Sequence, residues 1–255
     1  MKTPSTLFRG LTCCVLLAAF SSAAIGDEKK KPLALTPAPH PGKEKLHESF
    51  NEISQKGEAP LVFLGDSITQ GWSGKGKQVW EKYWAPLGAA NFGIGGDRTE
   101  HILWRLENGN YDGLKPKLTV LMIGTNNTGH EGREMSEHGG AVYSSTAEET
   151  ADGVAEIISV LQEKQPQMKI LLLAIFPRGA TPEDPKRQKN EKINAMIENL
   201  ADGEKVVFMD VNDVFLEEDG TLSKEIMPDL LHPNTHGYEL WAEAIEGKVK
   251  EMMDE

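Results

Sequence analysis

Five short runs of apolar residues recur along the chain, and each is continuous rather than alternating with polar positions. A run that is apolar at every position predicts a strand buried on both faces, as strands of a parallel sheet usually are. We therefore expect a parallel sheet of five strands. The runs lie at residues 61–64, 89–92, 118–123, 169–175 and 206–211.

The segments between these runs carry apolar residues at helical spacing. In residues 147–161 the apolar positions recur every three or four residues, so this helix has one stripe that faces the core. Strands that alternate with helices predict a three-layer α/β sandwich with right-handed crossovers. The helices are expected at residues 78–84, 99–107, 147–165, 186–200 and 233–252.

The N-terminus has the order of a secretory signal peptide. Lys2 and Arg9 precede an apolar stretch at 11–20, and small residues end at Ala24. The stretch is shorter than the ~20 apolar residues that span a bilayer, so we expect cleavage near Ala24, no stable membrane anchor and a secreted or periplasmic protein. The only cysteines, Cys13 and Cys14, lie in residues 1–24, which leaves the mature chain without a disulfide.

Residues 25–45 are rich in lysine and proline and poor in large apolar side chains, which predicts a flexible leader. His40 and His47 lie in or near this leader, and we assign neither of them a role. The remainder, residues 46–255, has the length of one α/β domain.

The balance of charge excludes some partners. The chain has 27 Lys and Arg residues against 39 Asp and Glu residues, a net charge of −12 at pH 7. Nucleic acids and anionic membranes are held chiefly by neutralising phosphate charge. We therefore expect no nucleic-acid partner and no binding to anionic lipid.

Residues with catalytic chemistry follow the predicted strands. Ser67 comes directly after the first strand in the sequence Gly-Asp-Ser, and about 160 residues later Asp229 and His232 stand three positions apart. Serine is a poor nucleophile unless a base accepts its proton, and the base needs a carboxylate to orient it. Parallel strands place their carboxyl ends at one edge of the sheet, where ligands bind in open α/β folds. The sequence thus predicts a Ser-His-Asp hydrolase.

At four ordered blocks the chain resembles the SGNH (GDSL-type) hydrolase family, and most closely the catalytic subunits of platelet-activating factor acetylhydrolase. The resemblance covers about residues 60–250. The blocks are Asn91-Phe92-Gly93-Ile94-Gly95-Gly96-Asp97, His101-Ile102-Leu103-Trp104-Arg105-Leu106, Gly124-Thr125-Asn126-Asn127 and Phe176-Pro177-Arg178-Gly179.

The resemblance implies a flavodoxin-like fold and a site without a metal or an organic cofactor. It makes Ser67 the nucleophile, His232 the base and Asp229 the partner of the base. The oxyanion hole would consist of the backbone N–H groups of Ser67 and Gly96 and the side-chain amide of Asn126. A homodimer is a further implication.

Two departures bear on substrate choice. The loop from Thr128 to Ser145 is longer than in those subunits and rich in glycine and charge, and the export signal is absent from them. An acetylated carbohydrate is therefore at least as good a candidate substrate as a small lipid-like ester. We predict a serine esterase that removes short acyl groups, most of all acetyl, from one of these classes.

Two other functions remain possible for this chain, and two other kinds of site are rejected. A glycan-binding module without catalysis and a lysophospholipase or longer-chain esterase are the alternatives, and the second would need an extended apolar channel. The glycines at 93, 95 and 96 do not indicate a dinucleotide site, because the third glycine of that motif falls on Arg98. His130 and His138, with glutamates near by, fit no common zinc spacing, and we expect a solvated loop there.

Overall fold

Five parallel strands form the central sheet in the order β2-β1-β3-β6-β7. The register aligns Gly65, the last residue of β1, with Gly93 of β2 and Met122 of β3, so three strands end level with one another. The prediction of a five-stranded parallel sheet in an α/β fold is confirmed. The strands are β1 (Leu61–Gly65), β2 (Ala89–Gly93), β3 (Leu118–Met122), β6 (Lys169–Leu173) and β7 (Val206–Met209).

Alternate residues of each strand enter two separate hydrophobic clusters, one on each face of the sheet. In β1, Val62 and Leu64 join the first cluster, whereas Leu61 and Phe63 join the second. All four side chains are buried, because helices cover both faces. This arrangement explains why apolar residues predominate in the strands without alternating with polar ones.

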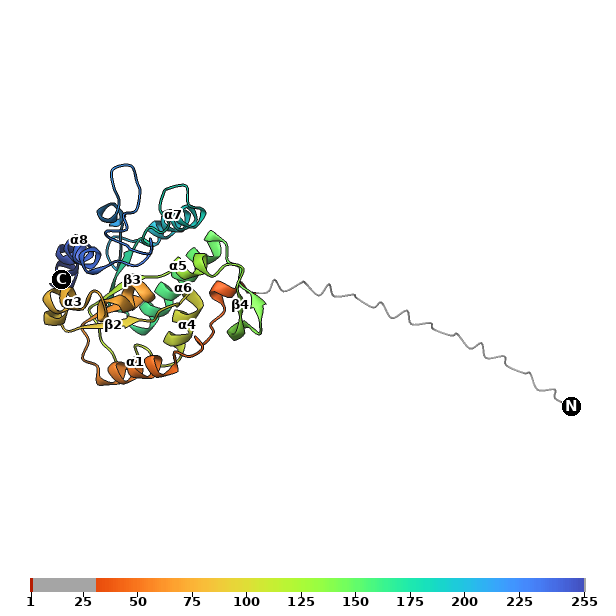
Figure 1. The fold of residues 1–255 in the computed structure, drawn as a ribbon. Helices are drawn as coiled ribbons and strands as arrows, with labels where there is room; N and C mark the ends of the chain where they lie inside the picture. The colour runs from red at the N-terminus through yellow and green to blue at the C-terminus, as the bar shows by residue number, and fades with distance from the viewer. Residues whose placement is uncertain (2–30, 255) are drawn as a thin grey trace. The chain divides into compact units, whose positions relative to one another are not determined.

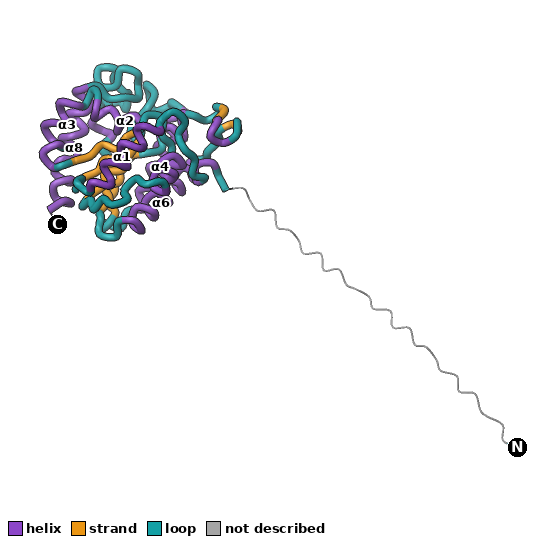
Figure 2. Tube along the Cα trace, turned by 90° about the horizontal axis from the view of Figure 1, so that it is seen from below, coloured by secondary structure: helices purple, strands orange, loops and turns teal. Residues whose placement is uncertain are grey.

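Helices form the outer layers of the sandwich (Figure 1). In this computed structural model, which describes residue 1 and residues 31–254, α1, α4, α6 and α7 pack on the first cluster and α3 and α8 on the second. Figure 2 shows α3 and α8 on one side of the strands and α4 and α6 on the other. The helices are α1 (Glu44–Lys56), α2 (Ser67–Gln70), α3 (Lys77–Tyr83), α4 (Thr99–Glu107), α5 (Thr125–Gly129), α6 (Ala147–Lys164), α7 (Pro185–Ile197) and α8 (Thr235–Asp254).

The chain from residue 31 to residue 45 packs against the domain, so the prediction of a flexible leader at 25–45 is wrong for this part. A 3-10 turn at Leu33–Leu35 lies against α4 and α6. Ala34 is fully buried, and its carbonyl oxygen accepts a hydrogen bond of 2.7 Å from Thr99 Oγ1. Tertiary contacts thus order a segment whose composition alone indicates disorder. The predicted signal peptide lies outside the described residues.

Several elements of the fold were not predicted, including the short helices α2 and α5. The loop after α5 contains a small antiparallel hairpin, in which β4 (Glu134–Met135) pairs with β5 (Ala141–Val142). Helix α1 lies where the sequence pattern predicted no element.

Among the described residues, no helix is long and apolar enough to cross a membrane.

Candidate active site

Ser67, His232 and Asp229 form a row of hydrogen-bonded side chains. Ser67 Oγ lies 2.8 Å from His232 Nε2, and His232 Nδ1 lies 2.7 Å from Asp229 Oδ2. An ionised carboxylate only accepts hydrogen bonds, so the proton of the neutral imidazole is on Nδ1 and the Nε2 lone pair faces the serine hydroxyl. The structure therefore brings together the three residues that the sequence predicted as catalytic, in the order that such chemistry needs.

Ser67 is the first residue of α2, which begins where β1 ends. Asp66 caps this short helix, because its Oδ1 accepts a hydrogen bond of 2.9 Å from the backbone N–H of Ile68. Tyr238 of α8 donates its hydroxyl to the carbonyl oxygen of Ile68 at 2.6 Å. Gly65 allows close packing here, since a Cβ at this position would lie 2.4 Å from the carbonyl oxygen of Met122. Strand, cap and α8 together fix the serine.

The carboxyl group of Asp66 is itself buried next to the candidate nucleophile. Its exposed fraction is 1%, and Oδ2 has no hydrogen-bond partner among the described residues. Burial raises the pKa of Asp66 from 3.8 to about 7, although the hydrogen bond from Ile68 opposes this shift. Asp66 is therefore a capping residue whose charge is costly in the folded state.

A tight turn holds His232 over Ser67. Asp229 Oδ1 accepts hydrogen bonds from the backbone N–H groups of His232 and Leu231, at 2.7 and 3.2 Å. Leu230 adopts a left-handed conformation with φ 59°, and its carbonyl oxygen accepts a hydrogen bond from Gly179 N–H. Partial burial would raise the pKa of Asp229, but the hydrogen bonds from His232 outweigh it and the pKa is lowered. Asp229 thus remains a carboxylate near neutral pH.

The three predicted oxyanion-hole residues also meet at this edge of the sheet. Ser67 follows β1, Gly96 follows β2 and Asn126 follows β3 at the start of α5. The backbone N–H of Ser67 lies in the first turn of α2, where amides have no acceptor within the helix. Asn126 Nδ2 donates one hydrogen bond to the carbonyl oxygen of Asp97 at 3.0 Å, and no other described residue accepts its second hydrogen.

A cavity of about 470 Å³ opens beside Ser67 and His232. The other lining residues come from the end of α2 and the segment after it, from the turn that carries Asp229, and from the start of α8. Several of these residues are polar. The lining residues are Ser67, Gln70, Gly71, Ser73, Gly74, Lys75, Asp229, His232, Pro233 and Tyr238.

His40 belongs to this region, although no sequence pattern indicated a role for it. Its Nδ1 lies 2.7 Å from Asp97 Oδ1, and the other carboxylate oxygen of Asp97 lies 2.9 Å from Arg105 Nη2. Asp97 is fully buried, and the His40 side chain is 18% exposed. No motif contains His40, and only the folded chain brings it next to Gly96.

The long loop after α5 is anchored by a buried arginine, so the prediction of a solvated loop is wrong for part of it. Arg98 contacts Glu100 and Glu137, donates to His130 Nδ1 at 2.8 Å, and lies over the ring of Tyr143. The side chains of Glu137 and His138 are only 6% and 5% exposed. The loop is therefore tied to the start of α4, beside the candidate oxyanion hole.

Three side chains in this cluster have the composition of a metal site. The potential ligand atoms of His40, Asp97 and His101 lie within 4.8 Å of one another. However, His101 Nδ1 accepts a hydrogen bond of 3.1 Å from the backbone N–H of Arg98. Burial and Arg98 lower the pKa of His101, which keeps it neutral. The Nδ1 lone pair of His101 already accepts this hydrogen bond and is not free for a metal ion. We therefore attribute the closeness of His40, Asp97 and His101 to hydrogen bonding.

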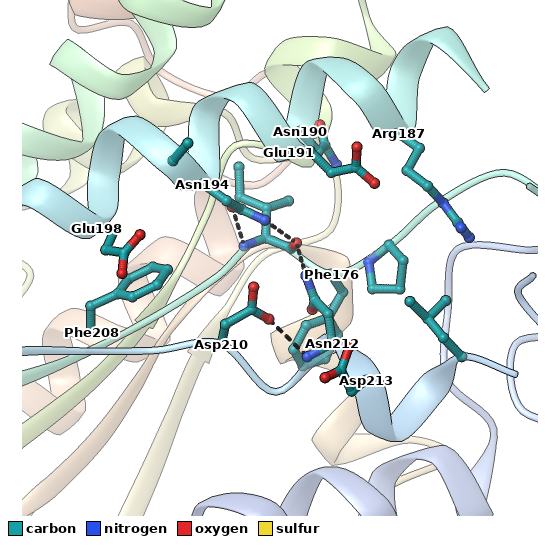
Figure 3. Close-up of a pocket in the computed structure, with 14 residues that line it drawn as sticks. Phe176, Arg187, Asn190, Glu191, Asn194, Glu198, Phe208, Asp210, Asn212 and Asp213 are labelled. Carbon is teal, nitrogen blue, oxygen red and sulfur yellow. Dashed lines mark hydrogen bonds between the residues drawn. The ribbon is translucent and has the colours of Figure 1, made fainter. Parts of the chain in front are cut away.

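A second cavity, of about 340 Å³, lies between α7 and the segment after β7 (Figure 3). Asn194 and Asn212 both donate to the carbonyl oxygen of Ile175, and Asn194 also accepts from its N–H. Asp210 accepts a hydrogen bond from Asn212 N–H. None of the predicted catalytic or oxyanion-hole residues lines this cavity. We therefore assign the chemistry to the cavity beside Ser67.

Sequence comparison places this arrangement in a known family. The model of the GDSL-like lipase/acylhydrolase family matches residues 63–240, and the chain belongs to this family. The bovine (Bos taurus) platelet-activating factor acetylhydrolase IB subunit alpha1 is 38% identical over 194 residues, which cover 76% of each chain. The bovine subunit alpha2 is 36% identical over 210 residues, covering 82% of this chain and 84% of its own length.

Solved structures share the fold at lower sequence identity. A GDSL-like lipase from Bacteroides thetaiotaomicron superposes with a TM-score of 0.64 and 22% identity, covering 82% of this chain and 98% of its own. An acetylxylan esterase from Geobacillus stearothermophilus gives a TM-score of 0.57 and 22% identity, covering 75% of this chain and 93% of its own. These neighbours establish the fold, and family membership establishes an acylhydrolase class.

Proposed function

We propose that this protein is a serine esterase that removes acetyl or other short acyl groups from carbohydrates or small lipid-like esters. The observation that carries the proposal is the row Ser67–His232–Asp229, with hydrogen bonds of 2.8 and 2.7 Å. Every side chain of the row already has the partner that its role requires.

The reaction begins when Ser67 Oγ attacks the ester carbonyl and His232 Nε2 takes the hydroxyl proton. The negative charge that develops on the carbonyl oxygen is held by the N–H groups of Ser67 and Gly96 and by the Asn126 amide. His232 then gives its proton to the leaving alcohol. Water, deprotonated by the same nitrogen, attacks the acyl-enzyme and releases the acid.

The cavity supports a short acyl group and a polar alcohol. A long alkyl chain in this space would lie against Gln70, Ser73 and Lys75, whose polar groups it would leave without water. The relatives support the same direction, since they include platelet-activating factor acetylhydrolase subunits and an acetylxylan esterase. Acetyl esters are therefore the first substrates to test.

We also propose where in or outside the cell the enzyme acts. The order of charged, apolar and small residues in positions 1–24 is that of an export signal. We infer a secreted or periplasmic enzyme that acts on its own or as a homodimer, without a metal or organic cofactor. Mass spectrometry of the exported protein would locate the cleavage site, which we expect near Ala24.

The experiment that tests the activity is acetate release from acetylated xylan, an acetylated monosaccharide and an acetyl phospholipid. Wild type is compared with Ser67→Ala and with Ser159→Ala, an exposed serine of α6 that serves as the matched control. Loss of the nucleophile should lower kcat by roughly 10³-fold or more, with a thermal midpoint within about 2 °C of wild type. Ser159→Ala should behave as wild type.

Each outcome decides between named functions. Release from glycans only defines a carbohydrate esterase, and release from the phospholipid only defines a lipid acetylhydrolase. Faster turnover of octanoyl than of acetyl p-nitrophenyl esters would instead favour a longer-chain esterase. If wild type binds acetylated sugar but releases no acetate from any substrate, the protein is a binding module and the proposal fails.

A further inference from the structure

Two imidazole rings flank Gly96, the candidate oxyanion-hole residue. A Cβ placed on Gly96 would lie 2.9 Å from Cε1 of His40, 3.4 Å from its Nε2, and 4.0 Å from Cε1 of His130. His40 comes from the N-terminal segment and His130 from the end of α5, so distant parts of the chain converge here. The mechanism described above uses neither ring.

The contacts of His130 determine which ring nitrogen carries its proton. Arg98 Nη1 lies 2.8 Å from His130 Nδ1, and a guanidinium group only donates hydrogen bonds. Nδ1 is therefore the acceptor and the proton is on Nε2. Partial burial and the charge of Arg98 lower the pKa of His130 to about 4, so the ring is neutral at pH 7. The Nε2–H group has no partner among the described residues.

His40 has the opposite tautomer. Its Nδ1 lies 2.7 Å from Oδ1 of Asp97, a buried carboxylate that is ion-paired with Arg105. The carboxylate accepts, so His40 Nδ1 carries a proton, and in the neutral ring Nε2 keeps a lone pair. No described residue donates a hydrogen bond to this nitrogen. The edge of His40 that faces Gly96 is therefore an acceptor, whereas His130 offers a donor.

Both rings are held in place. His40 stacks on His101 with ring centroids 4.3 Å apart and an interplanar angle of 19°. The backbone N–H of His130 donates to the carbonyl oxygen of Asn126 at 2.9 Å. A donor and an acceptor that are already oriented bind a ligand without further ordering cost. A few fixed polar groups of this kind are what orient a bound ligand and determine its specificity.

We propose that His40 and His130 form a hydroxyl-binding subsite, which selects esters whose alcohol carries a free hydroxyl group next to the acylated oxygen. A hydroxyl both donates and accepts, so it can donate to His40 Nε2 while it accepts from His130 Nε2–H. This inference rests on the proposed esterase function and narrows its substrate class to partly acylated polyols, of which carbohydrates are the main kind.

The test uses two acetates that differ by one hydroxyl group, trans-2-hydroxycyclohexyl acetate and cyclohexyl acetate. The quantity measured is the ratio of their kcat/KM values, from acetate release. If the two histidines bind the hydroxyl, kcat/KM for the hydroxy ester should exceed that for cyclohexyl acetate by roughly 10-fold or more. A wild-type ratio near one would overturn the inference and leave the esterase function intact, because both esters would still be cleaved.

Variants then assign the preference to the two rings. His40→Leu and His130→Leu should each reduce the ratio by about 10-fold, and His40→Gln and His130→Gln should partly restore it, since the amide keeps an acceptor and a donor. His236→Gln is the matched control, because this histidine is 62% exposed at the start of α8. Equal losses on both esters in the Leu variants would mean a structural role only and would contradict the proposal.

The failure of this inference can be separated from failure of the proposed function. If wild type cleaves neither acetate and Ser67→Ala changes nothing, the esterase assignment itself is wrong. If Ser67→Ala abolishes turnover but the ratio does not depend on His40 or His130, only the subsite is wrong. Circular dichroism of each Leu variant, matched to its Gln partner, excludes loss of folding as the cause.

Discussion

The side-chain amide of Asn126 donates a hydrogen bond to the carbonyl oxygen of Asp97 at a distance of 3.0 Å. The bond joins the loop after β3 to the loop after β2, and it spans the gap between the two strands that flank β1. It fixes the amide nitrogen next to Gly96, so the remaining N–H has a defined direction. A donor fixed in advance is what oxyanion stabilisation requires.

Replacing Asn126 should therefore impair the chemical step. We expect Asn126→Ala to lower kcat for p-nitrophenyl acetate by about 10²- to 10³-fold with little change in KM, because the donor matters chiefly in the transition state. Steady-state kinetics checks this. Asn126→Asp should fail similarly, since a carboxylate donates nothing. A change confined to KM would show that Asn126 binds ground-state substrate.

Asp229 should act through the orientation of His232. In Asp229→Asn, Oδ1 can still accept from the backbone N–H groups, but the amide cannot accept from His232 Nδ1–H, so the imidazole loses its required tautomer. On the pattern known for serine hydrolases we expect kcat to fall on the order of 10³- to 10⁴-fold. The thermal midpoint should change little, because the Asp229 side chain is 58% exposed. Activity within tenfold of wild type would remove Asp229 from the triad.

Asp66 should make the free energy of unfolding depend on pH. Its folded pKa of about 7 exceeds its ordinary value of 3.8, so the folded state binds more protons between these pH values. Stability contributed by the protonated form is therefore lost as pH rises from about 4 through 7. Asp66→Asn keeps the cap without the charge, and its thermal midpoint at pH 8 should exceed that of wild type by roughly 2–8 °C. Below pH 4 the difference should vanish.

Asp202 provides a control of opposite sign for that measurement. This exposed carboxylate accepts hydrogen bonds from the backbone N–H groups of Glu204, Lys205 and Val206, and the bond from Val206 is the main cause of its lowered pKa. Its contribution is present above pH 4 and lost as pH falls further. Asp202→Asn should therefore lower the midpoint at pH 8. A rise in both variants would contradict the account given for Asp66.

Arg98 should stabilise the domain by compensating two buried carboxylates. Glu100 is fully buried and the Glu137 side chain is 6% exposed. Arg98→Met therefore leaves both buried carboxylates without the positive charge that pairs with them. We expect a loss of about 3–5 kcal/mol in the free energy of unfolding, measured with denaturant. Arg133→Met, an exposed arginine on the loop that carries Glu137, is the matched control and should change this free energy by about 0.5 kcal/mol or less. Similar losses in both variants would refute this role.

The sheet could be predicted from the sequence because its three central strands, β1, β3 and β6, are buried on both faces. Leu61 to Leu64 are apolar without interruption; β1 and β3 are buried at all five positions, and β6 is buried at its last four. Helix α4 was predicted with its observed bounds, Thr99–Glu107. The short helices α2 and α5 have four and five residues, too few for a helical period to register. The β4–β5 hairpin has only two paired residues in each strand, so alternation could not indicate it.

The candidate triad was predictable because its residues lie in motifs, whereas the residues around it do not. His40 stands in a proline- and lysine-rich stretch, whose composition alone indicates disorder. What orders it is contact with α4 and α6, which no local pattern contains. The ion pairs of Arg98 join residues up to 39 positions apart, so the burial of the loop follows from tertiary structure alone.

The placement of the tryptophans gives the two helical layers separate optical signals. Trp72, Trp84 and Trp241 are fully buried in the layer of α3 and α8, and Trp80 packs against them. Trp104 lies in the other layer, where it lines a cavity of about 170 Å³ together with His40. A Trp104→Phe variant would therefore report fluorescence only from the layer of α3 and α8. The difference from wild type would follow the N-terminal segment as ligand binds or denaturant is added.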